Sequence, residues 1–234
     1  MIAAALLVVL AAPAASGVYF EQTTVVRSRA GEAAPGVRSR VWCAGRRLRL
    51  EAADAPGGPA LVLRLDEGRA LRLDPEAQLA TELDAERLRE RSQSDAAVAA
   101  GLMGGPAEDE LRTVALVRER TIAGHACRGF RISSPSAQVE AWVADDLPVR
   151  ADVFASFLEW SGAQQALAGL LAALRALPGF PLETRVRVSV LGEVQETVST
   201  VTAIKVVTPP AERFEVPAGW RTVKENANSR EVPR

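Results

Sequence analysis

Apolar and polar side chains alternate along most of the chain from Val18 onward, which is the period of a β-strand with one buried face. The first such run, VYFEQTTVVRSR, is rich in aromatic and β-branched residues and predicts a strand. In RSRVWCAGRRLRLEAA, Leu48 and Leu50 share one face and the intervening Arg49 points to the other. Two turns, DEG and DPEA, then separate three short strands. These segments predict an antiparallel meander with one wet face and one dry face.

Two segments replace this alternation with helical spacing. Residues 84–100 begin with Asp84, which can cap a helix through AERLRERSQ. Residues 153–177 are the most apolar stretch after the first 17 residues. Their apolar positions fall into two helical stripes: Val153, Phe154, Phe157 and Leu158, then Leu167, Leu170, Leu171, Leu174 and Leu177. The PGFP sequence ends the second helix, because proline cannot continue one.

Five further strands complete the pattern. LRTVALVRERTIAG, CRGFRISS and QVEAWVADD predict three of them, and LETRVRVSVL and EVQETVSTVTAIKVV predict two long ones joined at Gly192. The apolar stripes of the helices need a partner, so the helices must cover one face of the sheet. The pattern therefore predicts a large, strongly bent antiparallel sheet with helices in two insertions, without an internal repeat or a linker between two cores.

The two ends of the chain differ from this middle part. MIAAALLVVLAAPAASG is shorter than the roughly 20 apolar residues that span a bilayer and ends in small residues. It predicts a signal peptide over residues 1–16, cleaved between Ala14 and Ser16, although the usual positive n-region is missing. A buried first strand or helix is the alternative. We expect a single domain over residues 17–223 and a polar tail over 224–234.

Composition excludes several classes of function. The net charge is −1, the pI is near 6.0 and aromatic residues make up 5% of the chain, so neither a basic field nor stacking platforms favour nucleic acid. One histidine and two distant cysteines are too few for a tetrahedral zinc site. The carboxylates of ADDLP and Asp152 are interpreted as solvated, so no metal or cofactor is expected. With no nucleophile or phosphate-loop motif and one histidine, we expect no enzymatic activity.

TIAGHACRGFRI holds the only histidine and one of the two cysteines. In a strand the Cβ atoms of His125 and Cys127 would lie about 6.5–7 Å apart, beyond hydrogen-bonding reach, which disfavours a Cys–His nucleophile. We interpret His125 as a turn residue at the entrance of a hairpin. An exported chain meets an oxidising compartment, so Cys43 and Cys127 are predicted to form a disulfide across the sheet. Two buried free thiols are the alternative.

Five stretches in order resemble an exported bacterial family of unknown function that is grouped with LolA-like and LppX-like lipoprotein and lipid carriers: GVYFEQTT, TIAGHACRGFRI, AWVADDLPVRADV, LPGFPLETRVRV and ERFEVPAGWRTV. The resemblance covers nearly all of the chain after residue 16. It implies a mainly β fold of the α+β class: a bent, antiparallel, unclosed half-barrel whose concave face is covered by helical insertions. Carriers of this kind hold acyl chains in that groove. No lipid-gating residue of LolA aligns with a position here, so none is transferred.

The segment from Trp160 to Leu182 carries a single charge, Arg175. A helix that is apolar almost all round is buried on both sides or faces an apolar ligand. The glycines, glutamines, Arg175 and Pro178 of this segment argue against a transmembrane helix.

The leading hypothesis is a soluble, periplasmic, non-enzymatic carrier that binds an acyl chain, a lipid or a lipidated partner in an apolar groove. The candidate lid and groove residues are Phe154, Phe157, Leu167, Leu170, Leu171, Leu174 and Trp142, facing Leu48, Leu50, Leu63 and Leu65. A cavity of about 300–1,000 Å³ should remain between them. The alternative is a protein-interaction or envelope-stress sensor module on the same half-barrel, with an envelope protein as partner. A filled barrel would favour this alternative.

Overall fold

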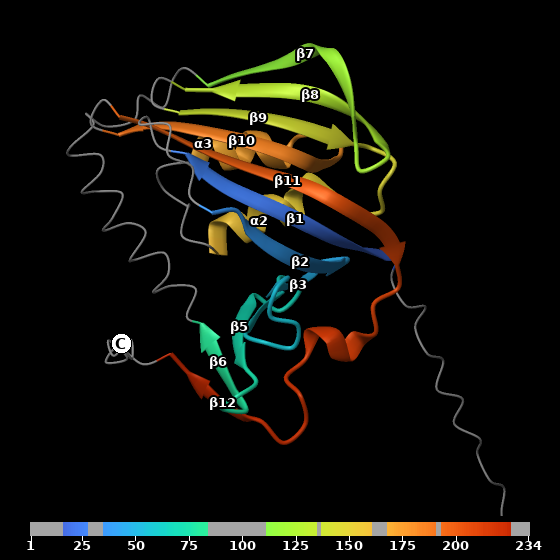
Figure 1. Ribbon diagram of the computed structural model, residues 1–234, viewed down its shortest axis with the longest axis vertical. Helices are drawn as coiled ribbons and strands as arrows, with labels where there is room; N and C mark the ends of the chain where they lie inside the picture. Colours follow the sequence, from blue (N-terminus) through green and yellow to red (C-terminus); the bar gives the residue numbers. More distant parts are fainter. Residues whose placement is uncertain are drawn as a thin grey trace, which may run out of the picture.

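The computed structural model describes residues 16–27, 35–83, 111–134, 137–160, 168–190 and 193–225. The strands form one twelve-stranded sheet in the order β12-β6-β5-β4-β3-β2-β1-β11-β10-β9-β8-β7. The sheet bends but does not close, because β12 and β7 are its two edges (Figure 1). Two short helices, α2 and α3, lie behind β10, β11 and β1 and cover the concave face. The prediction of a mainly β, unclosed half-barrel is confirmed.

The strands are β1 (Gly17–Arg27), β2 (Val37–Ala44), β3 (Arg47–Ala52), β4 (Ala60–Arg64), β5 (Arg69–Asp74), β6 (Leu79–Leu83), β7 (Arg112–Ile122), β8 (His125–Ser133), β9 (Ala137–Ala144), β10 (Phe180–Val190), β11 (Glu193–Val207) and β12 (Arg221–Lys224). The helices are α2 (Ala151–Trp160), α3 (Ala168–Arg175) and the short 3-10 helix η1 (Ala211–Phe214). Most neighbouring strands are also neighbours in sequence and pair antiparallel; β12 pairs with β6 in parallel. The first strand, β1, lies in the middle of the sheet between β2 and β11.

The hairpin between β7 and β8 turns through Ala123 and Gly124, which have φ values of 48° and 88°. Two consecutive positive φ angles are typical of the tight turns that match the twist of a hairpin, and glycine adopts them without steric cost. His125 is the first residue after this turn and pairs with Ile122. It therefore lies at the hairpin entrance, as predicted.

The alternation of the sequence divides the sheet into two faces. The helix face carries Val18, Phe20, Val41 and Cys43, which belong to a buried cluster that also includes Val153 of α2. The outer face carries the alternate residues of each strand. Examples are Tyr19 of β1 and the two residues paired with it, Trp42 of β2 and Lys205 of β11. The predicted separation of Leu48 from Arg49 is correct, because Leu48 joins the buried cluster and Arg49 pairs with Trp42 on the outer face.

The outer face itself has two halves. Over β3, β4 and β5 it is covered by the segment 208–220, in which Phe214 of η1 packs on Ala60, Val62, Leu71 and Leu73. We call the outer face of β3–β6 the covered half, and that of β1, β2 and β7–β11 the bare half. The segment 208–220 reaches the bare half at its border, where Trp42 and Ala44 of β2 pack against the cluster of Phe214.

Edge strand β7 is interrupted by a bulge. Ala115 pairs with Phe130 and Glu119 with Arg128, so residues 116–118 stand opposite Gly129 alone. Leu116 folds back onto the buried cluster, and Val117 is fully exposed at the tip of the bulge.

Three predicted features lie wholly or mainly outside the described residues: the signal peptide, the helix over 84–100 and the polar tail. Of that tail, Lys224 is the last residue of β12, and the backbone N–H of Glu225 donates to the carbonyl of Glu82 at 2.9 Å. Among the described helices, none is long and apolar enough to cross a membrane.

Candidate functional site

The helix face is filled where the lipid groove was expected. Phe154 of α2 sits against Phe20, Phe180 and Leu48, and the void between them has a volume of about 20 Å³. Such a volume holds about one water molecule. The expected cavity of about 300–1,000 Å³ is therefore absent between α2 and the sheet in the part of the chain that is described, because the rings of Phe20 and Phe180 pack edge to face and fill it.

The leucines of α3 pack elsewhere. Leu170, Leu171 and Leu174 are buried in a second cluster with residues of β8 and β9, such as Ile132 and Val139. They do not meet Leu48 or Leu50, which belong to the first cluster with Leu63, Leu65 and Phe154. Leu167 and the side chain of Phe157 lie outside the described part of the chain.

Trp142 is buried in the first cluster, which also holds Leu48, Leu63 and Val153. Its neighbours in β9, Ala141 and Val143, belong to the second cluster, so Trp142 points to the other side of β9. The guanidinium of Arg120 lies 4.9 Å from its ring, and a Cβ at Gly129 would lie 2.9 Å from that ring. Trp142 thus shares a buried cluster with residues that were expected to line the groove, and its place in a lipid groove stays a prediction.

The predicted disulfide is also wrong, because Cys43 and Cys127 are free and buried. Cys43 is on β2 and Cys127 on β8, and four strands lie between these two in the sheet. At a spacing of about 4.8 Å per strand, this is far beyond the reach of a disulfide on an open sheet. Burial raises the pKa of the Cys43 thiol to about 12, so it remains protonated and unreactive near neutral pH.

His125 and Cys127 do not form a nucleophile pair. The Nδ1 atom of His125 lies 2.8 Å from a carboxylate oxygen of Asp146, and the Cys127 thiol donates to the carbonyl of His125 at 3.5 Å. Asp145 pairs with Arg128 at 2.8 Å. The carboxylates of ADDLP thus hold arginine and histidine side chains, and no group of three potential metal ligands occurs among the described residues.

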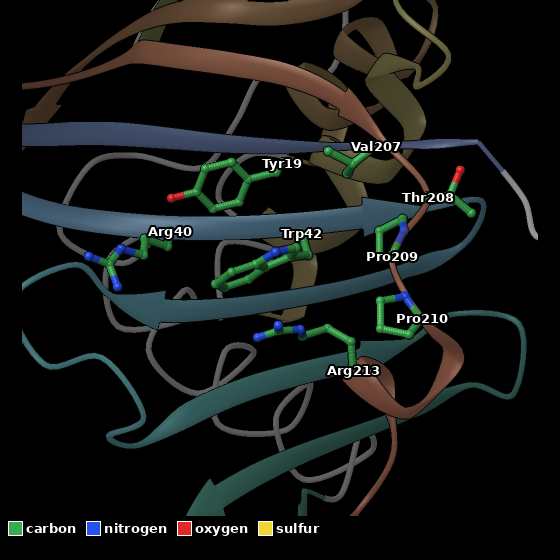
Figure 2. Close-up of a pocket in the computed structure, with 8 residues that line it drawn as sticks. All are labelled: Tyr19, Arg40, Trp42, Val207, Thr208, Pro209, Pro210 and Arg213. Atoms are coloured by element: carbon green, nitrogen blue, oxygen red, sulfur yellow. The ribbon is translucent and has the colours of Figure 1, made fainter.

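The larger hollow lies on the outer face, at the border of the covered half. Figure 2 shows Tyr19 of β1 and Trp42 of β2 side by side on this face, with Arg213 and the backbone of residues 207–210 along one side. Its volume is about 380 Å³. The complete lining is Tyr19, Arg40, Trp42, Val207, Thr208, Pro209, Pro210 and Arg213, which we call the aromatic groove.

Stacked side chains form the floor of the aromatic groove. Tyr19 and Trp42 are directly paired across the strands, and their ring centroids lie 5.1 Å apart. The guanidinium of Arg213 lies 4.5 Å from the Trp42 ring, in the geometry of a cation–π contact. The Tyr19 hydroxyl donates to Glu21 at 2.7 Å; burial and this hydrogen bond raise the pKa of Tyr19. The tyrosine therefore stays neutral at physiological pH.

The wall of the groove is held by the rest of the C-terminal segment. Pro210 has φ −65° and ψ 147°, the extended conformation of a polyproline helix, and it leads into η1. Arg49 donates to the carbonyl of Arg213 at 3.1 Å, and Phe214 is buried beneath. These contacts fix the position of Arg213 over Trp42.

Sequence reasoning did not find this site, because its members are far apart in the chain. The available signals were the consecutive prolines of TPPAERFEV, which predict a rigid extended wall, and the aromatic residues at outer-face positions of two strands. What the sequence could not show was that the two stretches meet.

The match that decides the family covers residues 83–220, which fit the description "Domain of unknown function (DUF4412)". The chain belongs to the DUF4412 family. The matched part includes β7–β11 and the wall of the aromatic groove, whereas Tyr19 and Trp42 precede it. No curated protein sequence matches the chain.

Several solved structures resemble this member of the DUF4412 family at a distance. PNGF-II shares 13% identity with a TM-score of 0.43 over 90% of this chain, which spans 31% of PNGF-II. An uncharacterized conserved protein from Thermus thermophilus shares 12% identity with a TM-score of 0.39 over 88% of this chain and 91% of its own. MucB in complex with MucA(peri) shares 11% identity with a TM-score of 0.43, covering 89% and 57%. These likenesses are too distant to support a functional assignment.

Proposed function

We propose that this chain is a non-enzymatic binding module of the cell envelope that holds a short extended segment of a partner protein in the aromatic groove. The observation that supports this most is the contrast in volume: about 380 Å³ is open at the aromatic groove, and about 20 Å³ remains under α2. A module that binds on the outer face needs no opening of the packed helices.

The chemistry of the aromatic groove suits a polypeptide. Extended and proline-rich segments dock into grooves lined by aromatic side chains, where the rings cover apolar side chains and the polar groups at the rim fix orientation. Here Tyr19 and Trp42 supply the rings, and Arg40 and Arg213 supply donors at the rim. Catalysis is not part of the proposal, since the thiol of Cys43 stays protonated and His125 is paired with Asp146.

The test is selection of a peptide library on the immobilised protein, followed by affinity measurement of the selected sequences. Replacing Trp42 by Ala should weaken binding at least tenfold, as expected for a central aromatic anchor. Arg213→Gln removes the cation–π contact and leaves the ring in place, so it should weaken binding less. Circular dichroism establishes that both variants fold. Peptides that bind the Trp42→Ala protein as tightly as the wild type would overturn the proposal.

A second candidate is the lipid or lipoprotein carrier. One observation favours it: the small void under Phe154 is lined by apolar side chains except for Gln22 and the Cys43 thiol. Separation of α2 from the sheet would enlarge this void into a site for an acyl chain, and each buried methylene would contribute about 0.8 kcal/mol.

Native mass spectrometry of the protein isolated from its own envelope distinguishes the two. A carrier should retain a lipid, and Phe154→Ala should change the retained amount because it enlarges the void. Leu171→Glu is the matched structural variant: Leu171 is 2% exposed in a packed cluster, so we expect that change to unfold the protein. A wild-type spectrum without bound lipid would remove the carrier from consideration.

A further inference from the structure

The bare half of the outer face carries its carboxylates beneath a layer of arginines. Around Glu196, which is 15% exposed, stand Arg27, Arg185 and Arg187, with exposed fractions of 54%, 34% and 46%. Glu140 is 17% exposed under Arg131, which is 47% exposed. The acids are thus shielded and the guanidinium groups face solvent.

The strand register shows how far this layer extends. Directly paired residues lie on the same face, and the outer face of β1, β2 and β7–β11 carries nine basic residues: Arg27, Arg38, Arg40, Arg112, Arg120, Arg131, Arg185, Arg187 and Lys205. It carries four acidic residues: Glu21, Glu140, Glu183 and Glu196. The surplus is five positive charges, in a chain whose net charge is −1. We call these nine residues the arginine surface.

Several of these arginines have N–H donors that no carboxylate of the described residues occupies. Arg38 and Arg112 are exposed and make no ion pair with the described residues. Arg120 and Arg131 each contact one carboxylate. A guanidinium has five N–H donors in a planar fork, so a paired arginine can still bind a second carboxylate or a phosphate.

We infer that the arginine surface docks an acidic, extended segment of the same partner protein whose anchor fills the aromatic groove. This inference rests on the proposed function, which supplies the partner protein, and adds that the bound segment of that partner is acidic. The two sites are continuous, because Arg40 belongs to both the aromatic groove and the arginine surface.

The geometry fits an extended polypeptide. Arg38 and Arg40 on β2, and Arg185 and Arg187 on β10, are two residues apart on one face, which corresponds to about 6.6–7 Å. Alternate side chains of an extended acidic segment have the same spacing, so successive carboxylates can meet successive guanidinium groups. The outer face is the convex side of the bent sheet, which a flexible chain can follow and a flat bilayer would meet only along a strip.

The binding experiment uses a fluorescent peptide of alternating Glu and Thr, about 12 residues long, which is the length of one long strand. The full chain should bind this peptide and should not bind the matched Gln–Thr peptide. Because exposed charges are screened by salt, affinity should fall about tenfold or more between low and high ionic strength.

Substitutions then locate the site. Arg38→Gln and Arg112→Gln leave no carboxylate unpaired, and each should weaken binding about two- to fivefold. Arg72→Gln removes an exposed arginine of β5 on the opposite face and is the matched control, which should leave affinity unchanged. The double change Arg187→Gln with Glu196→Gln keeps the net charge and should weaken binding, because it removes a donor from the surface.

The outcomes separate this inference from the proposed function. If Trp42→Ala weakens the selected peptides but the Glu–Thr peptide does not bind, the inference fails and the function stands. If vesicles containing phosphatidylglycerol bind the arginine surface and the Glu–Thr peptide does not, the surface recognises membrane and the inference is overturned. Equal loss of affinity in Arg72→Gln and Arg38→Gln would also overturn it, since binding would then follow net charge alone.

Discussion

The two halves of the outer face use arginine in different ways. On the covered half, the arginines meet carboxylates of neighbouring turns and of the C-terminal segment: Arg47 pairs with Asp66 at 2.8 Å and Arg64 with Glu215 at 2.5 Å. Arg64 also contacts Glu67, and Arg69 contacts Glu82 at 2.9 Å. On the bare half, one carboxylate, Glu196, serves three arginines.

The difference follows from what covers each half. Where the segment 208–220 lies on the sheet, it brings Glu215 and the apolar ring of Phe214, and the charges beneath are matched. Where no described segment lies on the sheet, the arginines keep unused donors. The covered half is therefore an internal example of how a chain docks on this face: one buried aromatic residue with a carboxylate next to it. The proposed partner would repeat this arrangement on the bare half.

The largest effect is expected when the segment 208–220 is released from the covered half. Phe214 is 1% exposed, and Phe214→Ala should lower the free energy of unfolding by about 3–5 kcal/mol, because it leaves a cavity among Val62, Leu71 and Leu73. Urea unfolding followed by tryptophan fluorescence measures this, since Trp42 and Trp220 contact the same cluster. Val216→Ala, at a half-buried position, is the control and should cost less. A loss below about 1 kcal/mol for Phe214→Ala would mean that the segment is not anchored by its aromatic ring.

A smaller effect should come from the charge that accompanies the ring. Glu215→Gln removes the carboxylate that Arg47 and Arg64 share, and Arg64 is 11% exposed at its side chain. Because Glu215 itself is 41% exposed, we expect a loss of about 1 kcal/mol rather than the larger cost of a buried pair. The matched control is Glu212→Gln in the same short helix, which is exposed and should be neutral. Equal losses in the two variants would show that the ion pairs do not fasten the segment.

The smallest effect should appear in acid, and it compares one carboxylate from each half. Burial opposes ionisation of Glu196, but the hydrogen bond from Arg187 and the charges of Arg185 and Arg27 hold its pKa below 4.5. The same opposition holds at Asp66. Burial raises the pKa of its carboxyl group, but the hydrogen bond and the charge of Arg47 hold that pKa below 3.8. A carboxylate with a lowered folded-state pKa stabilises the protein above its unfolded-state pKa and loses this contribution as the pH falls.

The unfolding free energy should therefore decrease below about pH 4.5, and Glu196→Gln should make that decrease shallower. Asp66→Asn should flatten the curve only at lower pH, below about 3.8. Chemical denaturation between pH 7 and pH 3 measures both. Parallel curves for the wild type and Glu196→Gln would contradict the assignment of Glu196 as a shielded, ionised group.

The period of two was sufficient to predict the faces wherever apolar and charged residues alternate, as at Leu48 and Arg49. In AQVEAWVA it likewise places Trp142 on the side of Gln138 and Glu140, opposite Val139. The disulfide prediction failed. Alternation places Cys43 and Cys127 in strands but not in an order, and the order places four strands between them.

The aromatic groove could not be predicted, because it depends on which strands pair with one another. The sequence predicts the extended Pro-Pro stretch and the exposed aromatic positions one by one. Their meeting depends on β1 pairing with both β2 and β11, which brings residues near 19, 42 and 207 together. The helical stripe of α3 was predicted correctly as an apolar surface; its partner was not, because a stripe specifies burial and not the strands that provide it.

The bulge in β7 has a consequence for the fate of the protein at high concentration. An uninterrupted eleven-residue edge would offer its free backbone groups to an edge strand of another copy, and sheets could then join edge to edge. Residues 116–118 break that line, and the projecting Val117 and Arg118 keep a second flat strand from aligning along its whole length. At the opposite edge, β12 offers only four residues. The sheet can thus remain open along both margins without seeding its own aggregation.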